Sequence, residues 1–272
     1  METQTSYLNP IAFRLFGLSI HWYAIFIVGG AAIGVWIACM EAKRIKEDSE
    51  VIIDYILIGL PLAIVGARLY YVLFNLPFFL TRPPLEMLAI QHGGLAIYGG
   101  LIGGIGTLYY MAKKKGFSFL KYADIMSPSV LFGQAAGRWG NFFNHEAFGG
   151  VVSRSFLADT LHLPAFIVNN MNIDGNYHHP TFLYESLWNF LGFAILMILR
   201  RKSGRFKEGQ LISAMITWYA FARFFLEGMR TDSLYLFGGI RISQVLSFVL
   251  FFAGIYLFVR FGKKNKLYFE EA

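Results

Sequence analysis

Seven long apolar runs, separated by polar connections, constrain this chain more than any other feature of its sequence. A helix that crosses the hydrocarbon core of a bilayer needs about 20 residues, and the core offers no water to unpaired backbone groups. Runs of this length therefore predict an all-α integral membrane protein with about seven transmembrane helices. The predicted spans lie at about 18–40, 51–74, 92–112, 120–142, 180–199, 209–228 and 240–260, within a single multi-pass domain that covers residues 1–272.

The composition supports this class and argues against a nucleic-acid partner. Hydrophobic residues make up 56% of the chain and charged residues 15%, whereas a soluble domain carries about 25% charged residues. The net charge of +7 could indicate a nucleic-acid binder. However, the basic residues stand at the ends of the apolar runs and form no stripe of their own. We therefore expect contacts with membrane lipids and none with nucleic acid.

The positions of the basic residues predict an orientation in the membrane. Sixteen of the 24 Lys and Arg residues, including every lysine, fall in the connections 41–50, 112–121, 199–209 and 260–266. The connections on the other side hold few basic residues. Because cytoplasmic loops are enriched in Lys and Arg, we expect the N-terminus outside and the C-terminus in the cytoplasm. The first apolar run lacks the features of a cleaved secretory signal and should be retained.

Two connections on the predicted outer side are long enough to form structure of their own. Residues 143–179 are mixed in composition and contain a turn-like stretch at 172–176, so we expect a small ordered extracytoplasmic head inserted into the membrane domain. Residues 75–91 contain three prolines and predict a shorter outer arm.

Polar and ionisable residues gather in the predicted outer halves of five spans. They include Tyr23, His92, Arg138, Asn141, Asn144, His145, Glu146, His179, Arg223, Glu227 and Arg230. Ionisable residues within a membrane are costly and usually face a cavity, a partner or a functional path. Arg138, Asn141 and His145 have the spacing i, i+3 and i+7, which places them on one face of a helix that continues that far.

The two arginines within these outer halves, Arg138 and Arg223, outnumber the nearby fixed carboxylates of the spans. Guanidinium groups with spare donors at headgroup depth favour a phosphate, which arginine binds with a planar pair of N–H groups. The glycines at 93–94 would expose backbone N–H groups at a helix start, which also favours an anion. The pattern predicts a phospholipid-headgroup site that opens outward. A simpler interpretation is also open, in which Arg223 and Glu227 form a structural ion pair and the histidines are interfacial anchors.

Several catalytic classes lack their motifs in this sequence. There is no H-E-x-x-H, no G-x-S-x-G and no P-loop. The carboxylate clusters that hold Mg²⁺ are missing from the spans. We therefore expect no metal and no cofactor. What remains is metal-free chemistry at an anionic lipid, or the binding or transport of a lipid.

Five segments carry a resemblance to a known family. They are HWYA (21–24), HGGLAIYGGLIGG (92–104), GRWGNFFNHEAFGG (137–150), HPTFLYES (179–186) and WYAFARFFLEGMRTDS (218–233). In this order and spacing they resemble bacterial prolipoprotein diacylglyceryl transferase, in the form found in Gram-positive bacteria. The resemblance implies transfer of the sn-1,2-diacylglyceryl group from phosphatidylglycerol to the lipobox cysteine of a prolipoprotein. A thioether forms and glycerol 1-phosphate leaves.

The resemblance also implies partners, a location and residue roles. The partners would be phosphatidylglycerol, the signal peptides of prolipoproteins and membrane lipids, with residues 150–178 guiding the signal peptide. The enzyme would lie in the bacterial cytoplasmic membrane, with its active site facing the outer leaflet. His92 matches the histidine proposed as the general base, with Tyr219 or the Arg223–Glu227 pair as alternatives.

The site residues that we expect fall into two groups. The catalytic residues are His92, Arg138, Arg223 and Tyr219, and the phosphatidylglycerol-binding residues are Arg138, Asn141, Asn144, Glu146, Gly149, Tyr23 and Glu227. Arg138 matches the family's phosphatidylglycerol-binding arginine. His145 stands where glycine is common in the family and could also line the site.

A different class of function fits part of the same pattern. A lipid transporter or scaffold would need a headgroup site and no covalent chemistry. Transporters favour discontinuous helices near the midplane and paired half-repeats, and neither is visible in this sequence.

Overall fold

A computed structural model describes the chain over residues 8–231, 239 and 241–270. The chain divides into two compact units: the first contains the residues up to 37 and from 123 onward, and the second contains residues 38–122. Each unit is described by itself. Residues 1–7, residues 232–238 of the predicted connection 229–239, and residue 240 at the start of the last predicted span lie outside the described residues.

Within the described residues, each of the seven predicted spans coincides with a long helix. These helices are α1 (Trp22–Arg44), α2 (Glu50–Phe74), α4 (Ile97–Lys115), α5 (Phe119–Asn144), α7 (Thr181–Leu199), α8 (Gln210–Met229) and α9 (Ile242–Lys264). Four of them, α1, α2, α7 and α9, are long and apolar enough to cross a membrane. That α4, α5 and α8 also cross it remains a prediction.

The third predicted span begins later than expected. Residues 90–92 form a short 3₁₀ helix, η2 (Ile90–His92), and α4 starts only at Ile97. Gly93 and Gly94 have φ angles of +82° and +76°, a left-handed conformation that interrupts a right-handed helix. His92 therefore precedes α4 and is not part of its first turn.

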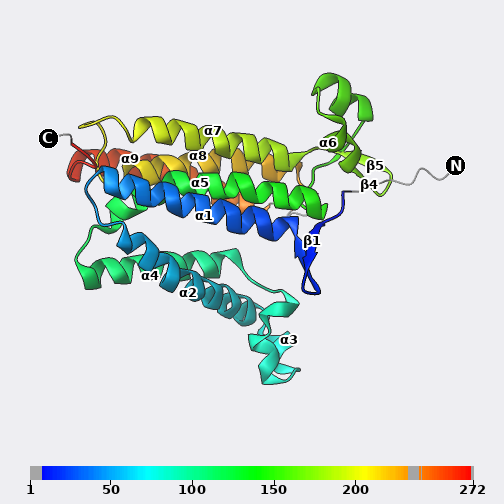
Figure 1. The fold of residues 1–272 in the computed structure, drawn as a ribbon, viewed down its shortest axis with the longest axis horizontal. Helices are drawn as coiled ribbons and strands as arrows, with labels where there is room; N and C mark the ends of the chain where they lie inside the picture. Colours follow the sequence, from blue (N-terminus) through cyan, green and yellow to red (C-terminus); the bar gives the residue numbers. More distant parts are fainter. Residues whose placement is uncertain (1–7, 232–238, 240, 271–272) are drawn as a thin grey trace. The chain divides into compact units, whose positions relative to one another are not determined.

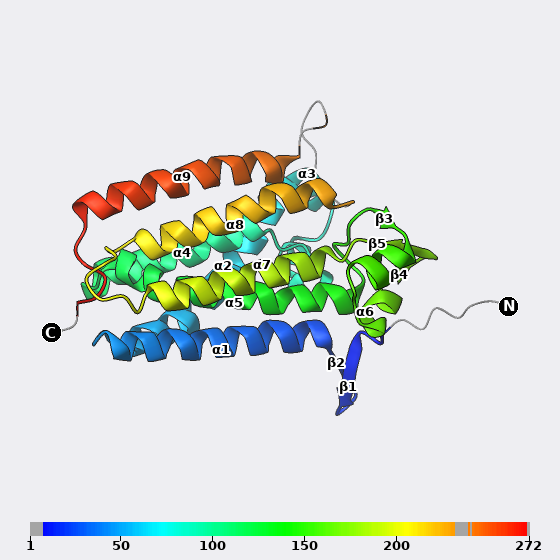
Figure 2. The same cartoon turned by 90° about the horizontal axis from the view of Figure 1, so that it is seen from above.

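In the first unit, α5, α7, α8, α9 and the first part of α1 run alongside one another (Figure 1, Figure 2). Gly30 of α1 allows a close approach to α5, since a Cβ on Gly30 would lie 2.9 Å from the Cβ of Ala136. Two indoles connect α7 and α8: Trp188 Nε1 donates to the carbonyl of Trp218 at 3.1 Å, and Trp218 Nε1 donates to that of Trp188 at 3.0 Å. Hydrogen bonds between helices of this kind fix their relative height.

The start of α8 is held by a carboxylate from α5. Asp124 is fully buried and accepts hydrogen bonds from the backbone N–H groups of Gly209 at 2.6 Å and Ile212 at 2.7 Å. The first N–H groups of a helix have no partner within it, and a negative charge there is favourable. Asp124 therefore caps α8 from a neighbouring helix and positions it against α5.

Two small β-sheets in the first unit correct the expectation of an all-α fold. A hairpin of β1 (Ile11–Leu15) and β2 (Leu18–His21) precedes α1. The second sheet has the order β3-β5-β4 and lies in the predicted head, residues 143–179. These strands have two to five residues, so a search for long apolar runs does not detect them.

The head is a folded segment with its own apolar core. Its elements are β3 (Val151–Val152), the π-helical turn η3 (Phe156–Thr160), α6 (Ala165–Asn170), β4 (Asn172–Ile173) and β5 (Asn176–His178). Leu157, Val168 and Met171 are buried in it and pack with Phe142 of α5 and Phe182 of α7. The head is therefore attached to the ends of two helices of the bundle.

In the second unit, α2 and α4 pack through glycines. A Cβ on Gly99 would lie 2.2 Å from the carbonyl oxygen of Gly66, so only glycine permits this contact. Along the chain, α2 and α4 are joined by α3 (Leu76–Leu80), η1 (Pro84–Leu88) and η2. These short helices form the predicted connection 75–91 and end at His92.

Candidate active site

A row of charged side chains runs across three helices of the first unit. Arg138 of α5 forms an ion pair with Glu185 of α7 through its Nε. The same carboxylate is 3.1 Å from Nη1 of Arg223 on α8, and Nη2 of Arg223 is 2.6 Å from Glu227 on the same helix. Two guanidinium groups from different helices therefore share one carboxylate.

The number of carboxylates in this row corrects the expectation that the two arginines outnumber the nearby acids. The side chains of Glu185 and Glu227 are 8% and 3% exposed, and those of Arg138 and Arg223 are 21% and 15% exposed. Arg138 and Arg223 do not outnumber the nearby carboxylates, since two acids face two arginines. Each arginine uses two nitrogens in the contacts described here, and a guanidinium carries five N–H donors, so both can donate a hydrogen bond to a further anionic oxygen.

Glu185 was absent from the predicted site residues. It lies within HPTFLYES, one of the segments that carry the resemblance, and inside an apolar predicted span. The rule that ionisable groups in spans mark functional paths would have identified it.

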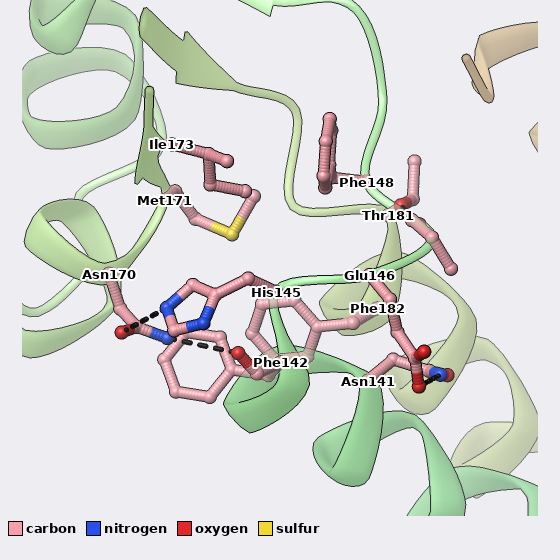
Figure 3. Close-up of a pocket in the computed structure, with 11 residues that line it drawn as sticks. Asn141, Phe142, His145, Glu146, Phe148, Asn170, Met171, Ile173, Thr181 and Phe182 are labelled. Carbon is pink, nitrogen blue, oxygen red and sulfur yellow. Dashed lines mark hydrogen bonds between the residues drawn. The ribbon is translucent and has the colours of Figure 1, made fainter. Parts of the chain in front are cut away.

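Amide side chains extend the row toward the end of α5. Arg138 Nη1 donates to Asn141 Oδ1 at 3.1 Å, and Asn141 Nδ2 donates to Glu146 Oε1 at 2.8 Å. Asn144 Nδ2 lies 3.4 Å from the same Glu146 oxygen. Figure 3 shows Asn141 and Glu146 facing one another. The structure thus brings together four residues that the sequence predicted as a group.

His145 does not join them, because the helix does not continue far enough to place it on the face of Arg138 and Asn141. The helix α5 ends at Asn144, and His145 has a φ of +53°. Its side chain turns toward the head, where Nε2 lies 2.8 Å from Asn170 Oδ1 (Figure 3). The pocket beside it has a volume of about 10 Å³, which is room for about one water molecule. His145 therefore connects α5 to the head.

Other predicted residues lie on elements that adjoin this row. Tyr219, Arg223 and Glu227 are spaced four residues apart on α8 and share one face of that helix. Tyr23 of α1 packs over Gly140 of α5, where a Cβ on the glycine would lie 2.6 Å from the tyrosine ring.

An apolar groove of about 330 Å³ lies between α1, α5 and α7. Phe26, Trp139 and Ser186 are among its lining residues. Trp139 and Ser186 directly follow Arg138 and Glu185 in the chain, so the groove and the charged row lie on the same stretches of α5 and α7.

Gly149 has a structural role that the sequence did not indicate. Its N–H donates to the carbonyl of His179 at 3.0 Å. A Cβ on this residue would lie 2.7 Å from His179 Cβ and 3.2 Å from the carbonyl oxygen of Met229. Gly149 therefore permits the chain to cross between the start of α7 and the end of α8.

His92 belongs to the second unit, where it ends η2. The backbone around it is held by Arg68 of α2, which is buried. Arg68 Nη1 donates to the carbonyls of Gly93 at 2.7 Å and Gly94 at 3.0 Å, and its other nitrogens donate to the carbonyls of Glu86 and Met87. One guanidinium therefore fixes the segment on both sides of His92.

His179, at the start of the HPTFLYES segment, is a further histidine of the first unit. Its Nδ1 lies 3.2 Å from the hydroxyl of Tyr184, and burial lowers the pKa of His179. Over residues 8–231, 239 and 241–270, no group of three or more His, Cys, Asp or Glu side chains is placed to bind a metal.

Long apolar helices with a buried row of arginines and carboxylates between them define a multi-pass helical membrane protein with a polar site. The model of the prolipoprotein diacylglyceryl transferase family matches residues 10–260. This chain belongs to that family.

Similar proteins are described as phosphatidylglycerol–prolipoprotein diacylglyceryl transferases. One from Enterococcus faecalis is 52% identical over 252 residues, which cover 93% of this chain and 90% of that protein. One from Bacillus velezensis is 52% identical, covering 93% of this chain and 92% of its own length. One from Bacillus licheniformis is 48% identical, covering 97% of each chain.

Proposed function

We propose that this chain transfers the sn-1,2-diacylglyceryl group of phosphatidylglycerol to the lipobox cysteine in the signal peptide of a prolipoprotein. The products are a thioether-linked prolipoprotein and glycerol 1-phosphate. Family membership supports the reaction. The observation that carries the proposal at the level of residues is the row in which Arg138 and Arg223 share Glu185.

The reaction breaks a carbon–oxygen bond and forms a carbon–sulfur bond. The sulfur of the peptide thiolate attacks the glyceryl carbon, and the phosphate oxygen leaves with the bonding electrons. A phosphodiester with one negative charge thereby becomes a phosphomonoester with more negative charge. Guanidinium groups held in place favour that increase in charge over the ground state. We assign this role to Arg138 and Arg223.

A base must take the proton of the attacking thiol. Histidine is suited to this task because its pKa lies near neutral pH. We assign the role to His92 on the strength of the resemblance, with Tyr219 and the Arg223–Glu227 pair as alternatives. The nucleophilic sulfur comes from the substrate, so Cys39 of this chain takes no part.

The remaining residues would orient the arginines and the lipid. Asn141 holds Arg138, Glu146 accepts from Asn141 and Asn144, and Glu227 holds Arg223. Tyr23 and Gly149 complete the phosphatidylglycerol-binding set that the sequence predicts. The groove between α1, α5 and α7 is apolar and is lined by Trp139, the residue after Arg138, so we assign it to an acyl chain of the lipid.

The proposed orientation in the membrane has seven spans, α1, α2, α4, α5, α7, α8 and α9. The N-terminus and the head lie outside, the C-terminus lies in the cytoplasm, and the site faces the outer leaflet of the bacterial cytoplasmic membrane. The distribution of Lys and Arg supports this arrangement. The head, between α5 and α7, would then guide the signal peptide toward the site.

A transfer assay tests the proposal directly. The purified chain is incubated with phosphatidylglycerol and a lipobox peptide, and the thioether adduct is sought by mass. Binding of phosphatidylglycerol with no adduct would favour a lipid-binding or transport protein and refute the transferase. Arg138→Ala should lower transfer by about 10²–10³-fold or more, whereas Arg201→Ala, at an exposed position after α7, should not.

The assignment of the base has a separate test. His92→Gln should abolish the chemical step and leave phosphatidylglycerol binding intact. Persisting transfer by this variant would place the base elsewhere, and Tyr219→Phe is then the next variant to assay.

A further inference from the structure

The β1–β2 hairpin has one fully apolar face, and this face is open. The register pairs Phe13 with Ile20 and Leu15 with Leu18. Because alternate residues of a strand point to the same side and paired residues share a face, these four side chains form one surface. Phe13 and Leu15 are each 51% exposed and Leu18 is 69% exposed. A two-stranded hairpin with an uncovered apolar face is at best marginally stable in water.

The opposite face of the same hairpin is polar. Arg14 pairs with Ser19 between the two apolar pairs, and both residues are exposed. The hairpin is therefore an amphipathic ribbon with a cation on its polar face. That pattern matches a lipid interface, where apolar side chains meet acyl chains and a guanidinium meets phosphates.

The tip of the hairpin carries an aromatic residue in a strained conformation. Phe16 has a φ of +48° and Gly17 a φ of +82°, the pattern of a type I′ turn, in which Asn-Gly and Asp-Gly are preferred. The turn between β4 and β5 in the head has that ordinary sequence, with Asp174 at +51° and Gly175 at +84°. Phe16 is 97% exposed, so neither backbone preference nor packing within the described residues explains a phenylalanine there.

The root of the hairpin fixes its place in the first unit. The backbone N–H of Trp22, the first residue of α1, donates to the carbonyl of Pro10 at 3.0 Å. The ring of Trp22 stacks on Phe143 at the end of α5, with centroids 5.1 Å apart. Figures 1 and 2 show the hairpin projecting sideways from the end of α1. Since α1 is a candidate membrane span, the hairpin lies at the level where that span leaves the bilayer.

We propose that the β1–β2 hairpin is a membrane anchor that inserts Phe13, Leu15, Phe16 and Leu18 into the lipid interface of the leaflet at the start of α1. Its polar face keeps Arg14 among the headgroups. By analogy with interfacial helices, the apolar side chains reach about 5–10 Å into the boundary between headgroups and acyl chains. The proposed topology makes this the outer leaflet, but lipid contact itself does not depend on the transferase reaction.

Site-specific fluorescence in vesicles tests this proposal. In a Cys39→Ala background, single cysteines at Leu18→Cys and Ser19→Cys receive an environment-sensitive dye, and the full chain is reconstituted into vesicles of phosphatidylglycerol and phosphatidylcholine. These neighbours lie on opposite faces of β2, so they form a matched pair. The dye at position 18 should show blue-shifted emission and lose intensity to lipids that carry a nitroxide near the headgroup. The dye at position 19 and one at Gly175→Cys in the head should be quenched by aqueous iodide instead.

Equal quenching of positions 18 and 19 by the lipid nitroxide would overturn the proposal. So would a dye at position 18 that is shielded only after addition of a lipobox peptide, or only as protein density in the vesicle rises. Those two results would make the face a peptide-binding surface or a contact between two copies. If Leu18→Cys fails to fold, Phe16→Cys at the tip replaces it and must give the same lipid quenching.

Discussion

Glu185 lies between two arginines that α5 and α8 contribute separately. Two guanidinium groups close together repel one another, and a shared carboxylate offsets this repulsion. Removing one member of a buried ion pair typically costs about 3–5 kcal/mol, because it leaves the other charge without compensation. Glu185 therefore positions both arginines before any anionic lipid arrives.

Replacing Glu185 should change the affinity for phosphatidylglycerol and the rate of diacylglyceryl transfer in different ways. We expect Glu185→Gln to bind phosphatidylglycerol at least as tightly as the parent chain, since the two arginines keep their charges and lose a competing anion. Its kcat for diacylglyceryl transfer should fall about 10–100-fold, because misplaced donors no longer match the leaving phosphate. Lipid binding and the transfer rate are measured on the same preparation.

The matched control for this prediction is an exposed carboxylate. Asp54 pairs with Lys115, and their side chains are 42% and 45% exposed, so Asp54→Asn should change neither quantity, as is usual for surface ion pairs. Weaker lipid binding by Glu185→Gln, with its thermal unfolding unchanged, would contradict the positioning role.

Two adjacent glycines give a second prediction at the scale of residues. A Cβ at Gly149 would meet His179 and Met229, whereas nothing lies within 4 Å of a Cβ at Gly150. We expect Gly149→Ala to lower the free energy of unfolding by about 1–3 kcal/mol, the usual effect of overpacking, and Gly150→Ala to have little effect. Thermal unfolding in detergent measures both. Equal stability of the two variants would mean that Gly149 acts on the substrate and not on the chain crossing.

At the scale of elements, Arg68 of α2 holds the backbone of the segment that contains His92. Arg68 donates to four backbone carbonyls, two of them directly after His92. This is a use of arginine that lysine cannot reproduce, because an ammonium group has three donors and no planar fork. The backbone position of His92 therefore depends on a side chain of α2 within the same unit.

Arg68→Lys should release this segment. We expect loss of about 1–3 kcal/mol of stability from the broken charge-assisted hydrogen bonds and a lower kcat, with phosphatidylglycerol binding retained. Arg82→Lys is the control in the same unit, because Arg82 is exposed and its guanidinium lies over the ring of Phe78. If Arg68→Lys keeps full transfer activity, the geometry of the His92 segment does not limit the reaction.

At the scale of the whole molecule, three of the proposed spans require an experiment. The helices α4, α5 and α8 carry more polar residues or glycines than α1, α2, α7 and α9, and only the latter four meet the length and hydropathy expected of a span. Polar residues are needed to build the site, and two of the helices with weaker apolar patterns, α5 and α8, contribute its two arginines.

Cysteine accessibility in intact cells tests whether α4, α5 and α8 cross the membrane. In a Cys39→Ala background, exposed positions in five of the predicted connections are changed one at a time to cysteine: Thr81, Lys114, Arg154, Lys202 and Thr231. An impermeant maleimide should label positions 81, 154 and 231 directly, and positions 114 and 202 only after the membrane is opened. Direct labelling at position 114 would mean that α4 does not cross the membrane.

The sequence alone determined the helical architecture, because a helix in lipid requires a run of apolar residues that is visible without any tertiary information. It also grouped Arg138, Asn141, Asn144 and Glu146, since they lie close together in one stretch of chain. The same local view missed the short strands before α1 and in the head. It also left open whether the helix reaches His145, and α5 ends one residue earlier.

Only the tertiary structure decided how the charges are paired. Glu185 and Arg223 are 38 residues apart, and Arg138 is a further 47 residues away from Glu185, so no local pattern shows that one acid serves both arginines. The fixing of the His92 segment by Arg68 and the close crossing at Gly149 are likewise contacts between distant segments. Apolar periodicity sets which segments become helices, but pairings between side chains depend on the packing of those helices, which their separate sequences do not encode locally.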